Sequence, residues 1–263
     1  MIQALNLEKR FGDLHAVRGV NFHIPPGQIC GYLGANGAGK STTVKMLTGL
    51  MRPSAGQAVV AGYNLATDPI PAKQRLGYVP ETGAVYEGLT PVEYLRFVGR
   101  LYNIPDSTLD NQIEAMLHHW GLLDQAGERM VGFSKGMKQK VVITAALLHD
   151  PDAIFFDEPL NGVDANAALL LKGLMARLAA AGKAILYTSH ILDVVERVCD
   201  RIIILQNGQI LADGTLDQLR SRAGHGTLEA IFNSLTNTTN TELAADAMMQ
   251  AIRAGAPRPV PSP

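Results

Sequence analysis

One eight-residue segment constrains the fold of this chain more than any other part of the sequence: Gly-Ala-Asn-Gly-Ala-Gly-Lys-Ser at positions 34–41. It fits the pattern G-x-x-x-x-G-K-[ST] at every fixed position, and it lies between an apolar run at 28–33 and a helical pattern from Lys40 to Leu50. Glycines let the backbone curl tightly, so that consecutive N–H groups and the positive end of the helix converge on a phosphate. The segment predicts a phosphate-binding loop (P-loop), in which Lys40 reaches the β- and γ-phosphates of a nucleotide and the Ser41 hydroxyl binds Mg²⁺.

Two adjacent carboxylates follow another apolar strand pattern. The run from Ala153 to Phe156 leads directly into Asp157 and Glu158. Neighbouring residues at a strand end point in different directions, so Asp157 can face Mg²⁺ through water while Glu158 faces an attacking water. Acidic residues often end strands, so the pair alone is weak evidence for a catalytic site. Its position after a P-loop makes it strong evidence.

Strand-like and helical patterns alternate along the chain, which indicates a mostly parallel sheet covered by helices. Asn207-Gly208 joins two short apolar runs and is typical of a type I′ hairpin. The expected fold class is α/β, a P-loop NTPase (RecA-like) core with an antiparallel β subdomain and an inserted α-helical subdomain. Strands are expected at 28–33, 153–156, 183–187, 202–205 and 209–212, antiparallel strands at 2–7 and 16–24, and helices at 40–50 and 191–199.

The character of the sequence changes to helix at about 86–148, where Thr90-Pro91-Val92-Glu93 forms a capping box with proline at the first helical position. We expect this stretch to be a helical subdomain inserted in a domain that spans 1–220. Residues 221–263 are expected to form a C-terminal extension, with a short possible helix at 242–253 and a disordered Pro-rich end.

Composition narrows the classes of function. The 263 residues are 47% hydrophobic, and 23 Lys plus Arg nearly balance 24 Asp plus Glu, so no global field recruits nucleic acid or anionic lipid. We therefore expect no nucleic-acid partner. No segment approaches the roughly 18 apolar residues of a membrane span, so any membrane association is expected to be peripheral. Cys30 and Cys199 lie in apolar segments, which favours buried core thiols in a reducing compartment over a disulfide or metal pair.

Further segments resemble the nucleotide-binding domain of ABC transporters, in the family's order and over nearly all of residues 1–220. Residues 133–139 resemble the signature, usually Leu-Ser-Gly-Gly-Gln, and match it at Ser134 and Gly136. Residues 157–164 look like the family's Walker B and D-loop run, and His190 ends the next strand as the switch histidine of the family does.

The resemblance implies roles for these residues. His190 would contact the γ-phosphate and hold Glu158 and water in position, and Phe11 would stack on adenine, although Tyr is the usual residue there. Ser134 is a plausible N-cap for a helix through Leu148. The expected catalytic residues are Glu158, His190 and Lys40, and the expected metal ligands are Ser41, Asp157 and Glu81. The expected ATP-binding residues are Phe11, Gly34, Asn36, Gly37, Ala38, Gly39, Lys40, Ser41, Thr42, Ser134 and Gly136.

Three positions depart from the family pattern. Glu81 stands where a glutamine usually touches Mg²⁺ and links to the membrane subunit; a carboxylate can ligate the metal, but it accepts hydrogen bonds without donating them. Lys135 and Met137 replace a glycine and a glutamine of the signature, so the contacts of those residues do not carry over. At these positions the chain resembles the ABC-2 type bacterial ATPases. Those ATPases serve separate six-span permeases, generally for export.

The resemblance also implies partners. A signature from one copy would close on the P-loop of another, so we expect a head-to-tail pair, most simply a homodimer, bound to a separate transmembrane permease at the cytoplasmic face of the inner membrane. One alternative is a soluble ABC ATPase that acts on ribosomes or nucleic acid. The other is a nucleotide switch with degenerate chemistry, which the complete set Lys40, Asp157, Glu158 and His190 disfavours.

Overall fold

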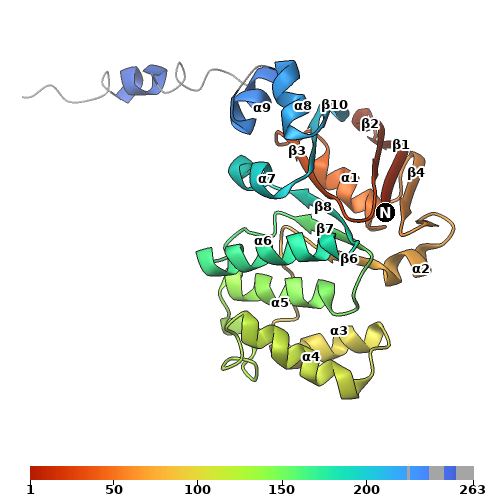
Figure 1. The fold of residues 1–263 in the computed structure, drawn as a ribbon, viewed down its shortest axis with the longest axis vertical. Coiled ribbons are helices and arrows are strands. Elements are labelled where there is room, and N and C mark those ends of the chain that lie inside the picture. The colour runs from red at the N-terminus through yellow and green to blue at the C-terminus, as the bar shows by residue number, and fades with distance from the viewer. Residues whose placement is uncertain (224–225, 237–245, 253–263) are drawn as a thin grey trace, which may run out of the picture.

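Two β-sheets and a set of helices make up the part of the chain that the computed structural model describes, residues 1–223, 226–236 and 246–252 (Figure 1). The strands are β1 (Ile2–Phe11), β2 (Leu14–Ile24), β3 (Ile29–Gly34), β4 (Ala55–Val60), β5 (Tyr63–Asn64), β6 (Leu76–Val79), β7 (Ala153–Asp157), β8 (Ala184–Thr188), β9 (Arg201–Gln206) and β10 (Gln209–Gly214). The helices are α1 (Lys40–Leu47), α2 (Pro69–Gln74), α3 (Pro91–Leu101), α4 (Asp106–His119), α5 (Lys135–Leu147), α6 (Ala165–Ala180), α7 (Leu192–Val198), α8 (Leu216–Ala223) and α9 (Leu228–Thr236), with a 3₁₀ turn η1 at Met130–Gly132.

The larger sheet carries the site. Its strand order is β10-β9-β3-β8-β7-β6, parallel except for the pairing of β10 with β9. Strands β3, β7 and β8 are buried almost throughout, as strands covered on both faces must be. Since parallel strands end at the same edge, the loops after β3, β7 and β8 meet there. The fold is therefore the expected α/β P-loop class.

The smaller sheet is antiparallel, in the order β2-β1-β4-β5, and helix α1 lies between the two sheets (Figure 1). Val44, Met46 and Leu47 of α1 are buried in a core that both sheets share. This packing fixes the start of α1, and with it the P-loop, against both sheets.

A second core joins the other face of the larger sheet to the remaining helices. Helices α3, α4 and α5 form a layer at the far end of the molecule from the antiparallel sheet (Figure 1). The capping box that begins α3 is confirmed, because Thr90 Oγ1 accepts a hydrogen bond from Glu93 N and Glu93 Oε2 accepts one from Thr90 N. The hairpin is confirmed too, since Asn207 and Gly208 both have positive φ, 49° and 78°.

The end of the chain holds more regular structure than the sequence suggested. Helix α9 at 228–236 was not predicted; it places Leu228 and Ile231 in the second core. A short helix at 246–252 overlaps the expected one at 242–253, whereas the expected disordered end lies outside the described residues. The division at residue 220 stays a prediction, and α8 crosses this position. Within the described part of the chain, no helix combines the length and apolarity needed to cross a membrane.

Candidate active site

The loop between β3 and α1 depends on its glycines. Gly37 and Gly39 have φ of 80° and 105°, in the left-handed region that disfavours other residues. A Cβ on Gly39 would lie 2.7 Å from the carbonyl oxygen of Ala16, and one on Gly34 would lie 2.6 Å from that of Leu205. No side chain therefore fits at Gly34 or Gly39, and the first N–H groups of α1 point into the loop, where they can bind an anion.

The ammonium of Lys40 lies across this loop. Its Nζ donates hydrogen bonds to the carbonyl oxygens of Gly34, at 2.5 Å, and Ala35, at 3.2 Å. Burial lowers the pKa of Lys40, and the nearby carboxylates oppose this shift, that of Glu158 most strongly. The charge sits where phosphate oxygens would replace the two carbonyl groups.

Thr188, at the end of β8, holds both acids at the end of β7. Its Oγ1 donates a 2.5 Å hydrogen bond to Asp157 Oδ1 and accepts one of 3.1 Å from Glu158 N. The parallel register places Asp157 directly beside Thr188. Burial raises the pKa of the Asp157 carboxyl, and the hydrogen bond from Thr188 opposes that shift. Glu158 has φ of 51°, unusual for a residue with a side chain, and backbone of this kind is concentrated at functional sites.

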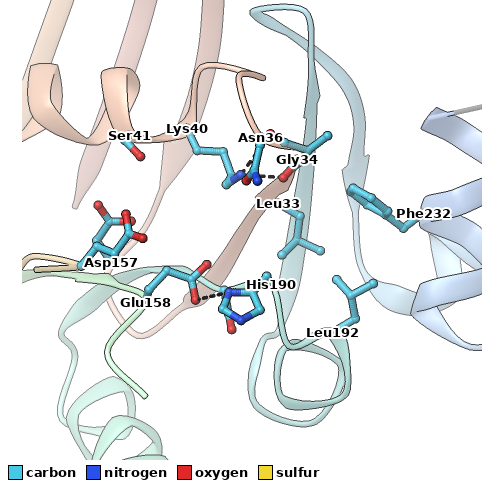
Figure 2. Close-up of a pocket in the computed structure, with 13 residues that line it drawn as sticks. Leu33, Gly34, Asn36, Lys40, Ser41, Asp157, Glu158, His190, Leu192 and Phe232 are labelled. Atoms are coloured by element: carbon cyan, nitrogen blue, oxygen red, sulfur yellow. Dashed lines mark hydrogen bonds and ion pairs between the residues drawn. The ribbon is translucent and has the colours of Figure 1, made fainter. Parts of the chain in front are cut away.

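His190 faces the second acid. Its Nδ1 lies 2.9 Å from Glu158 Oε2, and the two side chains meet at the mouth of the cavity (Figure 2). The histidine side chain is 68% exposed and the glutamate only 11%. With Nδ1 turned to the carboxylate, Nε2 is the ring nitrogen that could serve another partner.

These side chains line one cavity of about 600 Å³ (Figure 2). It brings together eight of the predicted residues: Gly34, Asn36, Lys40, Ser41, Glu81, Asp157, Glu158 and His190. A neighbouring cavity of about 270 Å³ adds Phe11, Gly37, Gly39 and Thr42 beside the same loop. Phe11 is 45% exposed, with the Lys9 ammonium 5.3 Å from its ring centroid. Together the cavities offer a charged end for phosphates and an aromatic side chain beside it.

Three predicted residues line neither cavity. Ala38 is buried beneath the loop. Ser134 and Gly136 begin α5, which lies on the side of the larger sheet away from α1 (Figure 1). Ser134 Oγ accepts a 3.2 Å hydrogen bond from Met137 N, so the predicted N-cap is confirmed and its O–H remains available as a donor.

The start of α5 is fixed to the loop that follows the acid pair. Gly136 packs against the backbone oxygen of Gly162 so closely that a Cβ could not fit between them. Lys140 Nζ lies 2.8 Å from Asp164 Oδ2, and Asp164 Oδ1 caps α6 by accepting from Ala167 N. These contacts hold the signature segment and the D-loop together.

Comparison with known proteins decides the family. The profile of the family described as "ABC transporter" matches residues 17–161. The ABC transporter ATP-binding protein NatA of Bacillus subtilis is 38% identical over 240 residues, which are 89% of this chain and 97% of NatA. This chain belongs to the ABC transporter family of ATP-binding proteins. The linearmycin resistance ATP-binding protein LnrL of B. subtilis is 37% identical over 87% of this chain and 73% of its own length. The daunorubicin/doxorubicin resistance ATP-binding protein DrrA of Streptomyces peucetius is 33% identical over 92% of this chain and 73% of its own length.

Solved structures agree with this assignment. The ATP-binding subunit of an ABC transporter superposes with a TM-score of 0.85 at 34% identity, covering 89% of this chain and 99% of that one. A dimeric ATP-binding cassette in a post-hydrolysis state, bound to ADP and Pi, shares the fold at a TM-score of 0.74 and 22% identity, covering 82% of this chain and 99% of that one. The chain is thus an ABC-type ATP hydrolase.

The donor set of this ABC ATPase suits Mg²⁺. Within the described ranges, no three His, Cys, Asp or Glu side chains are grouped so that they could hold a metal by themselves. Mg²⁺ usually keeps waters and binds one or two carboxylates together with substrate phosphates, and its ligands are oxygens. The Ser41 hydroxyl and the buried Asp157 carboxylate, with Glu81 on the cavity wall, provide oxygens of this kind.

Sequence reasoning missed several residues at the site of this ABC ATPase, and three of them matter for its geometry. Thr188 was given no role by the sequence motifs, yet it holds both acids. Leu192 and Phe232 line the larger cavity beside His190. Phe232 lies 42 positions after His190, in a segment at 227–232 that looks like the C-terminal segment of the ABC-2 type ATPases, but this resemblance gave it no role at the site. Leu228, Ile231, Phe232 and Leu235 do recur at helical spacing, so the helix itself had a signal.

Proposed function

We propose that this chain is the ATP-driven motor subunit of an exporter whose pore is a separate membrane permease, and that two copies close around ATP. One observation carries the pairing: the P-loop and the acids line one cavity, whereas Ser134 and Gly136 of the signature lie outside it, on another side of the sheet. A second copy in head-to-tail orientation supplies the missing half of each site, and two-fold symmetry makes the two sites equivalent.

In this pair, ATP first holds the two copies together. The start of α1 in one copy and the start of α5 in the other are helix N-termini, whose N–H groups and dipoles favour anions. Closure removes water from the triphosphate and strengthens these interactions. Hydrolysis and phosphate release then remove the charge that holds the copies together.

Hydrolysis uses residues placed on separate loops. Glu158 orients and deprotonates the attacking water, while His190, held to Glu158 through Nδ1, presents Nε2 to the γ-phosphate. Lys40 stabilises the charge that develops on the phosphate oxygens. Mg²⁺, held by Ser41 and Asp157 with Glu81 nearby, supplies charge neutralisation when bound.

The permease is proposed to dock on the helical subdomain beside Glu81. Large apolar side chains are exposed on this subdomain: Tyr86 by 63%, Phe97 by 46% and Leu101 by 66%. The rings of Tyr86 and Phe97 meet edge to face at 6.1 Å, and Phe97 and Leu101 line a shallow hollow of about 440 Å³. An amphipathic helix of the permease fits such a surface. Through it, the protein would be held peripherally at the cytoplasmic face of the membrane.

The proposal of export rather than import rests on the similarity to resistance proteins for linearmycin and for daunorubicin/doxorubicin.

The deciding experiment is co-purification of tagged protein from its native membranes, followed by mass spectrometry. Recovery of a polytopic membrane protein, lost in a Tyr86→Ala/Phe97→Ala double variant, supports the proposal. Recovery of ribosomal or nucleic-acid-bound partners without a membrane protein would leave the ATPase assignment intact and overturn the transport claim.

A further inference from the structure

Helix α9 is hydrogen-bonded at its two ends to helix α7 and strand β9. At its start, the backbone N–H of Leu228 donates to Glu196 Oε2 at 3.0 Å, and at its end the carbonyl oxygen of Thr236 accepts from Gln206 Nε2 at 2.9 Å. Glu196 belongs to α7, which begins two residues after His190, and Gln206 ends β9. Since β9 pairs with β3, which leads into the P-loop, α9 connects the histidine loop to the strand beside the phosphate-binding loop.

The same glutamate also holds α8. Glu196 Oε1 lies 2.8 Å from Arg220 Nη2, and Arg220 Nε donates to the carbonyl oxygen of Gly226 in the turn before α9. One side chain of α7 therefore binds both C-terminal helices. Contacts with α7, the helix that follows the histidine loop, therefore help to fix the position of α9.

Phe232 extends from α9 into the wall of the cavity. Leu228 and Ile231 are fully buried in the core below, while Phe232 is half-buried at the edge of the core. It faces the cavity from the side opposite the acids, with Leu33 and Leu192 as its apolar neighbours on the cavity wall (Figure 2). Leu192 begins α7 only two residues after His190, so this part of the apolar wall directly follows the loop that carries the histidine.

In the described structure, the histidine side chain has few contacts of its own. The His190 side chain is 68% exposed and is held to the acid by one contact of 2.9 Å. Within the loop, Ile191 N donates to Ser189 Oγ at 3.0 Å, and the Ile191 side chain is itself 40% exposed. Leu192 and Phe232 both pack against the same core and line the same wall of the cavity, so the position of Leu192 restricts where the histidine ring can sit.

We propose that Phe232 is a positioning residue for ATP hydrolysis: through Leu192 it holds the loop that carries His190, so that α9 completes the catalytic site. The inference rests on the proposed roles of Glu158 and His190. It assigns the C-terminal helix a part in turnover rather than in nucleotide binding, because Phe11 and Phe232 lie in different cavities, and Phe232 lines the one that holds the acids.

Steady-state ATP hydrolysis by the purified full chain tests this, with Phe232→Ala, Phe232→Leu and a matched control, Leu235→Ala. Leu235 is also half-buried, on the same helix and against the same core, but it does not line the cavity. Misplacement of a reacting group by about 1 Å can cost on the order of 100-fold in rate. Since the histidine acts here through one intermediate residue, we expect Phe232→Ala to lower kcat about 10-fold while KM for ATP stays within about twofold. Phe232→Leu should restore most of kcat, and Leu235→Ala should keep it.

A double variant separates positioning from general destabilisation. If Phe232 acts through His190, then adding Phe232→Ala to His190→Ala lowers kcat no further, because coupled residues are not additive. Equal losses in Phe232→Ala and Leu235→Ala, additive losses with His190→Ala, or a raised KM at unchanged kcat would each overturn the inference. Should the alanine variant fail to fold, Glu196→Gln loosens α9 with Phe232 in place, and it should lower kcat in the same direction.

The outcome also distinguishes the inference from the function on which it rests. If His190→Ala and Glu158→Gln both keep wild-type kcat, the proposed catalytic roles fail, and the positioning role fails with them. If both variants lose activity while Phe232→Ala keeps it, only the positioning role is wrong.

Discussion

His190 Nδ1 lies 2.9 Å from Glu158 Oε2, so a histidine that is mostly exposed and a glutamate that is mostly buried form one close pair on the cavity wall. The glutamate reaches this position because its backbone adopts a positive φ and donates to Thr188. Strand β7 supplies the acid and the loop after β8 supplies the histidine. Small movements between these adjacent strands would change the pair directly.

Glu158→Gln should abolish turnover while preserving ATP binding. Glutamine keeps the size of the side chain but cannot accept a proton from water, and loss of a positioned general base lowers rates by about 10²- to 10⁴-fold. We expect the variant with ATP and Mg²⁺ to migrate as a dimer in size-exclusion chromatography, and wild type to return to monomer as ATP is consumed. Glu128→Gln, on an exposed residue outside the cavities, is the control. Sustained turnover in the Glu158 variant would exclude the assigned role.

Asp157→Asn should stabilise the nucleotide-free protein while abolishing Mg²⁺-dependent hydrolysis. Burial raises the pKa of Asp157 above its value in the unfolded chain, so the folded state favours the protonated form. The charged carboxylate therefore destabilises the fold above the raised pKa, and this cost disappears as pH falls toward the unfolded pKa. Asparagine carries no charge and can still accept the hydrogen bond from Thr188. We expect Tm to rise by a few degrees at pH 7.5, since each 1 kcal/mol shifts Tm by about 2 to 4 °C in a chain of this size, and by less at pH 5.

The control variant for this prediction should change Tm in the opposite direction. The hydrogen bond with Lys140 lowers the pKa of Asp164, so its charged form stabilises the fold. Asp164→Asn should therefore lower Tm at pH 7.5. Thermal melts of both variants without nucleotide or Mg²⁺ test the pair, and a fall in Tm for Asp157→Asn would contradict the account of the buried acid.

Gly136→Ala should impair pairing of the two copies without unfolding the chain. A Cβ at this position meets the backbone oxygen of Gly162, so the D-loop must shift, and overpacking of this kind costs about 1 to 3 kcal/mol. Gly132→Ala is a close control, because a Cβ there meets no atom within 4 Å. In a Glu158→Gln background, only the Gly136 variant should reduce the fraction of ATP-dependent dimer. Equal dimer fractions would separate the signature glycine from the pairing surface.

The sequence alone predicted the features that depend on a short local motif. The P-loop, the Thr90 capping box and the Asn207-Gly208 hairpin are each specified by residues a few positions apart, and the structure has all three. Their backbone geometry follows from local sterics and hydrogen bonds, which a single sequence reveals.

Contacts that depend on tertiary packing were not predictable in the same way. Thr188 meets Asp157 only because β7 and β8 pair in one particular register, and no local pattern reports that register. Phe232 reaches the cavity because Glu196 and Gln206 fix both ends of α9. The segment before it is polar and was interpreted as an extension, although its apolar residues recur at helical spacing.

Phe11→Ala should weaken ATP binding with little effect on kcat. The ring is 45% exposed beside the P-loop, and stacking of a base on an aromatic side chain contributes about 1 to 3 kcal/mol, or roughly 5- to 150-fold in affinity. Phe11→Tyr should keep the affinity, because the stacking face remains. Phe97→Ala is the matched control, since that ring is 46% exposed but lies on the helical subdomain, away from the nucleotide. Equilibrium titration with a nonhydrolysable ATP analogue measures all three variants. If Phe11→Ala and Phe97→Ala bind the analogue equally well, adenine does not stack on Phe11, and the nucleotide must be held by its phosphates alone.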